Sequence, residues 1–190
     1  MDAVVATFLW RRLEDPGHDA CRLLSSGDGW RLEGTAVFRA AAGACCLRYQ
    51  VLADSRFRTR RATVTGHLGR RAVDLRIGAP GRAGSGRWRL NGEPVPGVDG
   101  CLDLDLGFTP ATNLLPIRRL ALRVGEAAEA PAAYLSFPAL RLRPLPQRYR
   151  RTGRHAYAYE APTFGYAGTL SVTRHGAVRD YPGLFELVGQ

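Results

Sequence analysis

Two carboxylates, Asp103 and Asp105, stand two positions apart in the run 101–106. In an extended strand, residues two apart project from the same face, so both side chains would point the same way. Such a pair could hold a cation or divide acid and base roles, the latter requiring one carboxyl with a raised pKa. Leucines occupy the alternate positions of this run. The aspartates are therefore equally readable as the solvent side of an ordinary strand, paired with arginine, and both interpretations stay open.

Patterns typical of metal sites and nucleophilic catalysis are absent from the sequence. The four histidines show neither His-x-His nor His-Glu-x-x-His spacing, and there is no Gly-x-Ser-x-Gly. The four cysteines, at positions 21, 45, 46 and 101, form no Cys-x-x-Cys. The sequence therefore predicts no metal, no cofactor and no disulfide framework.

All 27 basic residues are arginine, and the net charge is +10 over 190 residues. The arginines occur as scattered pairs, such as Arg60-Arg61 and Arg118-Arg119, and not as one basic arm. This distribution favours solvated guanidinium groups on outward strand faces, with an anion- or phosphate-binding surface as the alternative. No RNA-binding aromatic signature, helix-turn-helix or zinc-finger spacing accompanies them, so we expect no specific nucleic-acid partner.

The apolar run 3–10 is followed, not preceded, by Arg11-Arg12. This order is the inverse of a signal peptide, and the run is too short to cross a bilayer. We therefore expect a cytoplasmic protein with no membrane span.

Strands must position these groups, because period-two alternation dominates the chain. From Trp30 to Phe38, apolar or small residues fall on one face and polar residues mostly on the other. Similar segments recur at 45–53, 58–67, 73–77, 87–90, 101–106, 118–124, 133–137, 140–143, 155–160, 166–173 and 184–188. Short strands at this spacing predict an all-β, mainly antiparallel fold with a curved sheet.

The breaks between these segments are of β type, with one exception. Asn91-Gly92 is a two-residue hairpin signal. The only predicted helix covers 109–115, where Thr109 can cap, Pro110 suits the first helical position and Pro116 would end the helix. We expect residues 1–190 to form a single domain. Segments 49–74 and 157–180 share a weak echo that would fit a duplicated half-sheet.

The run from Gly100 to Leu120, with its Thr-Pro-x-Thr-Asn-x-Leu-Pro-Ile-Arg-Arg-Leu block, resembles the bacterial family described as "putative glycolipid-binding", formerly a domain of unknown function. Further blocks of that family follow in order across nearly the whole chain, at 29–34, 49–51, 58–60, 86–92, 147–149 and 180–184. One departure is Phe57, where the family pattern leads us to expect Trp.

The resemblance implies a spiral β-roll, in which a many-stranded antiparallel sheet wraps around one short helix. It also implies a homodimer and, by analogy of shape with periplasmic lipoprotein carriers, a glycolipid ligand. We therefore expect a non-catalytic glycolipid- or lipid-binding protein that holds an amphipathic ligand on the concave face of the sheet.

Two alternatives remain, an enzyme of glycoconjugate or small-molecule metabolism that uses Asp and Arg near the short helix, and a structural or interaction protein. The candidate ligand-binding residues are Trp30, Arg60, Trp88, Asp103, Asp105, Thr109, Asn113, Arg118 and Arg119.

Overall fold

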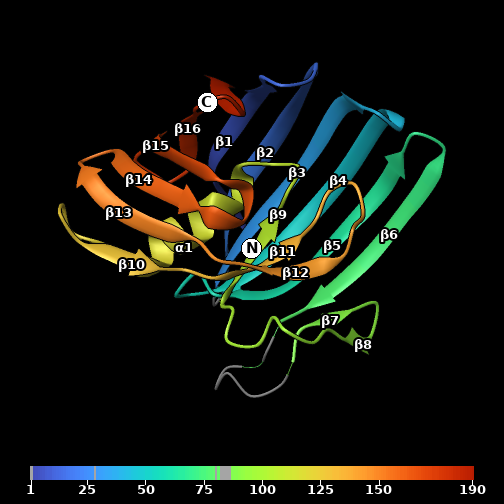
Figure 1. Ribbon diagram of the computed structural model, residues 1–190, viewed down its shortest axis with the longest axis horizontal. Coiled ribbons are helices and arrows are strands. Elements are labelled where there is room, and N and C mark those ends of the chain that lie inside the picture. Colours follow the sequence, from blue (N-terminus) through green and yellow to red (C-terminus); the bar gives the residue numbers. More distant parts are fainter. Residues whose placement is uncertain (1, 28, 80, 82–86) are drawn as a thin grey trace.

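A computed structural model describes residues 2–27, 29–79, 81 and 87–190, and one large curved sheet dominates it (Figure 1). The sheet has 14 strands in the order β10-β13-β14-β15-β16-β17-β1-β2-β3-β4-β5-β6-β7-β8, and all its pairs are antiparallel. Its strands are β1 (Ala3–Arg12), β2 (Gly17–Ser26), β3 (Gly29–Ala40), β4 (Gly43–Asp54), β5 (Thr59–Leu68), β6 (Arg71–Gly78), β7 (Arg89–Leu90), β8 (Glu93–Pro94), β10 (Ala127–Glu129), β13 (Arg148–Gly153), β14 (Ala156–Ala161), β15 (Tyr166–Val172), β16 (Val178–Tyr181) and β17 (Phe185–Gly189).

A smaller layer lies on the inner side of this sheet (Figure 1). It holds a three-stranded sheet in the order β12-β11-β9, built from β9 (Asp103–Leu106), β11 (Ala132–Leu135) and β12 (Leu142–Leu145). The β9–β11 pair is parallel, unlike every pair of the large sheet. The 3-10 turn η1 (Ala111–Asn113) runs directly into the helix α1 (Leu114–Leu120), and a second 3-10 turn, η2 (Pro162–Phe164), follows β14. The all-β, mainly antiparallel fold around one short helix is confirmed.

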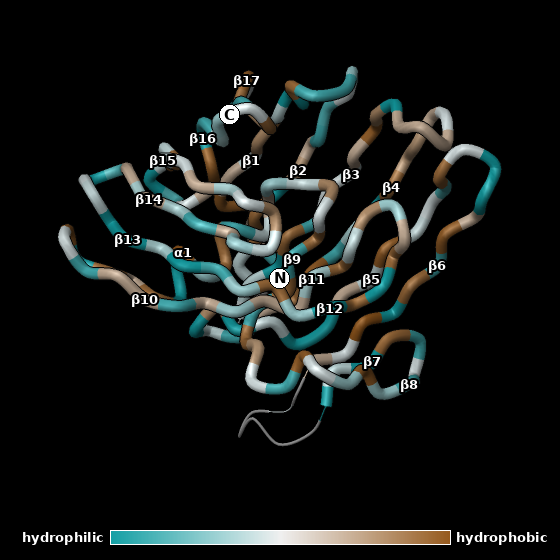
Figure 2. Tube along the Cα trace, viewed as in Figure 1, coloured by the Kyte–Doolittle hydropathy of each residue, from teal (hydrophilic) through white to brown (hydrophobic). Residues whose placement is uncertain are grey.

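Alternation along the strands explains why the sheet has a dry inner face. In β3, Leu32, Ala36 and Phe38 are buried while Val37 and Arg39 are exposed, and similar alternation of hydropathy is visible along neighbouring strands in Figure 2. Burial of these apolar side chains against the inner layer is the main favourable term for the fold, at roughly 25 cal/mol per Å² of apolar surface. The predicted hairpin at Asn91-Gly92 is confirmed as the turn between β7 and β8.

The core has two parts. The larger apolar cluster lies between β1–β6 and the inner layer. The second cluster lies between α1 and strands β13 to β16, and it contains Tyr149, Tyr157 and Tyr159. Tyrosines in a core need partners for their hydroxyl groups, so this second part is the more polar one.

The helix is longer than expected. The prediction that Pro116 ends it is wrong, because α1 continues to Leu120. Pro116 lies in the first turn of α1, where a backbone N–H has no intrahelical acceptor and its loss is tolerated. The predicted strand at 118–124 is wrong for the same reason, since its first residues belong to α1 and the chain then leaves the helix through Ala121, which has φ +47°.

No helix among the described residues is both long and apolar enough to cross a membrane. The two segments that echo each other in sequence fall on β4–β6 and β14–β16, and each forms a run of consecutive antiparallel strands. The duplicated half-sheet and the single domain stay predictions.

Candidate functional site

Strand β9 is held in the interior by side-chain hydroxyls as well as by β11. The N–H of Leu104 donates to Oγ1 of Thr59 (3.0 Å), and the N–H of Leu106 donates to Oγ1 of Thr112 (3.2 Å). These bonds satisfy backbone donors on the side of β9 that no strand covers, which a buried strand requires. The two aspartates of β9 therefore lie in the interior of the roll.

Asp103 is paired with an arginine of α1. Its carboxylate receives Nη2 of Arg119 at 2.6 Å and Nε at 3.0 and 3.2 Å, and Asp103 is only 1% exposed. Burial raises the pKa of Asp103, and the hydrogen bonds and charge of Arg119 oppose that shift. The expected ion pair is therefore present, but the interpretation of Asp103 as the solvent side of a strand is wrong.

Asp105 has a different environment. It accepts one hydrogen bond among the described residues, on Oδ2 from Nε2 of Gln147 at 2.6 Å. Burial raises the pKa of Asp105 to about 6, Gln147 opposes the shift, and the nearby Asp103 adds to it. Its Oδ1 accepts no hydrogen bond from the described residues, and Asp105 lines a pocket.

Thr109 belongs to a second polar group in the interior. Its Oγ1 accepts the N–H of Ala111 at 3.0 Å, and its hydroxyl donates to Asp19. The N-cap of η1 is Pro110, so the predictions that Thr109 is the cap and Pro110 the first helical residue are wrong by one position. The hydroxyl of Tyr49 also donates to Asp19, at 2.9 Å. Burial raises the pKa of Asp19 to about 6, and the hydrogen bonds from Thr109 and Tyr49 oppose that shift.

Asn113 connects η1 to the tyrosines, because its Nδ2 donates to the hydroxyl of Tyr149 at 3.0 Å. Asp105, Thr109 and Asn113 all line one pocket of about 360 Å³, which we call the tyrosine pocket. Its other lining residues are Glu14, Gly107, Tyr134, Leu145, Tyr159, Ala161, Phe164, Tyr166, Leu184, Tyr181 and Phe185. The volume is near the lower end of the range of small-molecule sites, ~300–1000 Å³.

Aromatic rings form one wall of the tyrosine pocket. Tyr159, Tyr166 and Tyr181, on β14, β15 and β16, contact one another with ring centroids 5.3 to 6.0 Å apart. Burial raises the pKa of each of the three phenols, so they stay neutral near pH 7. A neutral phenol can donate or accept a hydrogen bond while its ring offers an apolar surface.

Tyr134 and Phe164 also line the pocket. Their rings meet edge to face at 5.4 Å, and Phe164 is 57% exposed. Tyr134 can lie here because residue 107 is glycine: a Cβ on Gly107 would sit 2.5 Å from the ring and hydroxyl of Tyr134. An exposed aromatic ring beside a pocket that contains polar groups is a typical contact for the apolar chain of a ligand.

The other candidate residues lie apart from this pocket. Trp88 is fully buried and donates to the carbonyl of Cys101 (3.1 Å), while Trp30 stacks on Phe57 at 4.7 Å. Arg60 pairs with Asp54 at 3.6 Å. The guanidinium of Arg118 lies 5.1 Å from the Phe57 ring.

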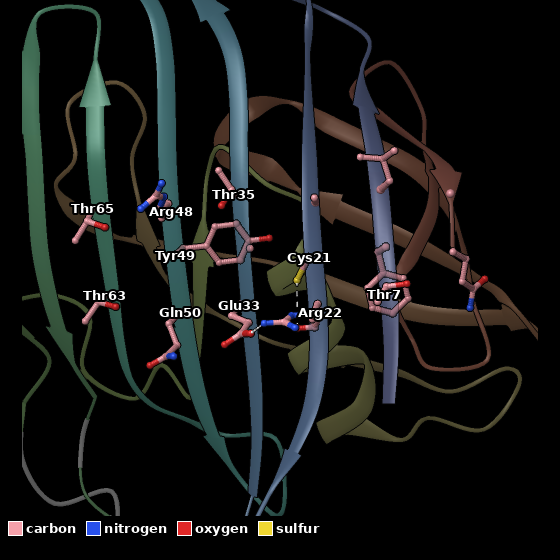
Figure 3. A pocket seen from close by; sticks show the side chains of 16 residues that line it. Thr7, Cys21, Arg22, Glu33, Thr35, Arg48, Tyr49, Gln50, Thr63 and Thr65 are labelled. Carbon is pink, nitrogen blue, oxygen red and sulfur yellow. Dashed lines mark hydrogen bonds and ion pairs between the residues drawn. The ribbon is translucent and has the colours of Figure 1, made fainter. Parts of the chain in front are cut away.

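A larger hollow, of about 760 Å³, is an open trough on the outer face of β1–β5 (Figure 3). Its lining includes four threonines, Thr7, Thr35, Thr63 and Thr65, and an ion pair between Arg22 and Glu33. Among the described residues that line this trough, none is a buried acid, whereas the tyrosine pocket combines Asp105 with aromatic rings. We therefore take the tyrosine pocket as the candidate site.

Sequence reasoning missed Asp19, Gln147, Thr112 and the tyrosines of β14–β16. The one signal for Asp19 is its spacing: it lies on the same face of β2 as Cys21 and Leu23, which are both buried. Tyr149 has an ordinary core position, whereas Tyr166 and Tyr181 pack against the same cluster and also line the pocket.

Comparison with known proteins places this architecture in a family. The family described as "Putative glycolipid-binding" matches residues 7–186. The structure is similar to the crystal structure of a DUF1089 family protein from Pseudomonas aeruginosa, with a TM-score of 0.77, 34% sequence identity, and coverage of 88% of this chain and 90% of that chain. Among curated proteins, no match was found. Because the family match spans almost the whole chain and a structural relative shares its fold, the chain belongs to the "putative glycolipid-binding" family.

Proposed function

We propose that the chain is a non-catalytic binding protein that holds the sugar head group of an amphipathic glycolipid in the tyrosine pocket. The observation that carries the proposal is the placing of Asp105, with a free Oδ1, at the base of a pocket walled by tyrosine rings. Sugar hydroxyls need carboxylate, amide and phenol partners, while the C–H faces of a sugar ring pack on aromatic rings. The tyrosine pocket offers both.

The apolar part of the ligand would leave the pocket past Phe164, Leu184 and Phe185. These side chains line the pocket, and Phe164 is largely exposed. An alkyl chain against them would remove apolar surface from water on both partners.

Calorimetry with an alkyl maltoside, below its critical micelle concentration, tests the proposal against an alkyl sulfobetaine of equal chain length. We expect the maltoside to bind and Asp105→Asn to weaken its binding about tenfold, because a carboxylate acceptor is lost. Phe164→Ala should weaken it about threefold, since only part of one ring is removed from the contact. Asp99→Asn and Val124→Ala, at exposed positions outside the pocket, are the matched controls.

Equal affinity for the sulfobetaine would contradict sugar recognition, because that ligand has the chain without the sugar. Absence of maltoside binding, or equal losses in the pocket variants and their controls, would contradict the proposal as a whole.

A second candidate function, glycoside hydrolysis, is favoured by one observation. Asp105, whose pKa burial raises to about 6, and Glu14 line the same pocket, and a pair of carboxyl groups is what that chemistry requires. The same incubations, assayed for released maltose, distinguish it: release that is abolished in Asp105→Asn would replace the binding function by catalysis.

The cytoplasmic location and the homodimer also belong to this proposal. The four cysteines are free, and three of them are buried, which suits a reducing compartment. Apolar side chains on the outer face of the sheet, among them Leu9, Val37 and Val188, are exposed in the single chain. Light scattering of the purified chain is expected to give the mass of two copies; the mass of one would contradict the dimer.

A further inference from the structure

A second pocket, of about 340 Å³, opens at the C-terminal end of α1. Four of its lining residues are arginines, Arg118, Arg151, Arg154 and Arg174, and none is acidic. They come from α1, from β13 and the turn after it, and from the turn between β15 and β16. The other lining residues are Ile117, Ala121, His155, Tyr157, Val172, Thr173 and Gly176.

Arg151 is the fixed cation of this pocket. Its guanidinium donates to the carbonyls of Leu122 (2.8 Å), Gly153 (3.2 Å) and Arg154 (2.8 Å), which engage three of its five N–H groups. The ring of Tyr157 lies 5.8 Å from it. Carbonyl partners orient the guanidinium but do not neutralise its charge, so two donors and a full positive charge remain for a ligand.

The charge of the other arginines is not cancelled locally either. Within the described part of the chain, the ion pairs engage arginines at positions 11, 22, 31, 60, 119, 123 and 148, and none of the four that line this pocket. The pKa of the neighbouring His175 is lowered, first by burial and then by the positive charges of Arg174 and Arg118. The contribution of the two arginine charges, unlike that of burial, marks a positive potential that favours an anion.

An adjoining hollow of about 440 Å³ extends the same surface. It shares His155, Val172, Thr173 and Arg174 with the first pocket and adds Ser171, Arg179 and Gln190, with no Asp or Glu side chain in its lining. Gly176 keeps the entrance open beside Arg118, because a Cβ there would sit 3.1 Å from the Arg118 side chain.

We propose that this arginine pocket is an anion site that takes a phosphate group, separate from the tyrosine pocket. Guanidinium groups match phosphate oxygens in two-point contacts, and several of them converging from different elements provide the specificity that scattered surface arginines lack. The two pockets are neighbours along β14, since Tyr157 lines one and Tyr159 the other. The phosphate group belongs either to a lipid head group or to a free phosphate ester.

Titration with glycerol 3-phosphate, followed by calorimetry and by NMR of the histidine ring protons, tests the free ester. Flotation with phosphatidylcholine vesicles, with and without phosphatidic acid, tests the lipid source. The test variant is Arg154→Gln with Arg174→Gln, because both side chains are exposed and Arg151 keeps its backbone partners. The control is Arg61→Gln with Arg143→Gln, which removes the same charge at exposed positions on β5 and β12.

We expect binding to one of the two sources, at least about tenfold weaker in the test variant and within about twofold of the wild type in the control. The pKa of His175 should rise when phosphate binds to the wild type and not when it is added to the test variant. Binding of neither source, or equal losses in the two double variants, would overturn the proposal, because the arginines would then act only as diffuse positive charge.

Discussion

At the residue scale, the buried pair of Asp103 and Arg119 sets a strong expectation. Arg119→Ala should lower the free energy of unfolding by about 3 kcal/mol, because it leaves a buried carboxylate without its partner. The neighbouring Arg118→Ala removes an exposed guanidinium beside Phe57 and should lower it by no more than about 1 kcal/mol. Urea unfolding of the two variants measures the difference. Equal losses would mean that the pair contributes no more than a surface contact.

The same residues show what local pattern can and cannot predict. Alternating Asp and Leu predicts a strand, and β9 is one, but alternation is identical for a strand with a wet face and for one with a polar layer inside the protein. Only the position of β9 under the large sheet decides between them. The hydrogen bonds of Asp19 could not be predicted from local pattern, because its partners Tyr49 and Thr109 lie 30 and 90 positions away in the sequence.

At the scale of elements, the pair β3–β4 depends on a glycine. Tyr49 is directly opposite Gly34, and a Cβ at Gly34 would sit 2.4 Å from the Tyr49 hydroxyl. Gly34→Ala should therefore displace Tyr49 from Asp19 and lower the free energy of unfolding by about 2 kcal/mol. Adding Tyr49→Phe to Gly34→Ala should lower the free energy of unfolding by less than Tyr49→Phe does in the wild type, because the contact between Tyr49 and Asp19 is already broken. Additive losses in thermal unfolding would contradict this coupling.

Most elements could be predicted, but their ends and a few whole strands could not. The long strands with one dry face, such as β3 and β4, match the alternation closely. Strand β2 has no clear alternation because it carries Asp19 on its inner face and a pair of adjacent buried leucines. The helical segment was predicted to begin at Pro110 with Thr109 as its cap, but η1 begins at Ala111 with Pro110 as its N-cap. Its end was also wrong, because α1 continues past Pro116 to Leu120, and Ile117 packs in the tyrosine-rich cluster.

At the scale of the whole molecule, Asp19 and Asp105 affect how the free energy of unfolding depends on pH. Asp19 and Asp105 have pKa values of about 6 in the folded chain, whereas an unburied aspartate has an ordinary pKa of 3.8. Between these values the folded state binds more protons than the unfolded state, so the free energy of unfolding falls as pH rises from about 4 to 6. The total fall is on the order of 1–3 kcal/mol for each acid.

In Asp105→Asn this fall should be smaller, and the variant should gain stability relative to the wild type above pH 6. Urea unfolding between pH 4 and 7.5 measures the effect, with Asp99→Asn as the exposed control. An identical pH profile in Asp105→Asn and the wild type would show that the carboxyl of Asp105 titrates normally.

The curvature of the sheet and the order of its strands were the parts of the fold least accessible to reasoning on residues alone. The resemblance to a roll-forming family supplied the shape, while the alternation supplied only candidate strands. Which strands pair depends on the total free energy of many contacts between distant residues. The pairing of β10 with β13 and the parallel pairing of β9 with β11 are examples.

The pairing of β1 with β17 joins the two ends of the chain in the middle of the sheet. Trp10 is fully buried, and its Nε1 donates to the carbonyl of Val178, 168 positions later, at 2.6 Å. On a ribosome, that carbonyl is made roughly 10 to 30 seconds after Trp10. During this time one edge of β1 is unpaired and Trp10 is not covered by its later partners. Such a segment can bind a chaperone, and it can pair with a strand of another nascent copy. The roll therefore cannot complete its core until β16 and β17 have been synthesised.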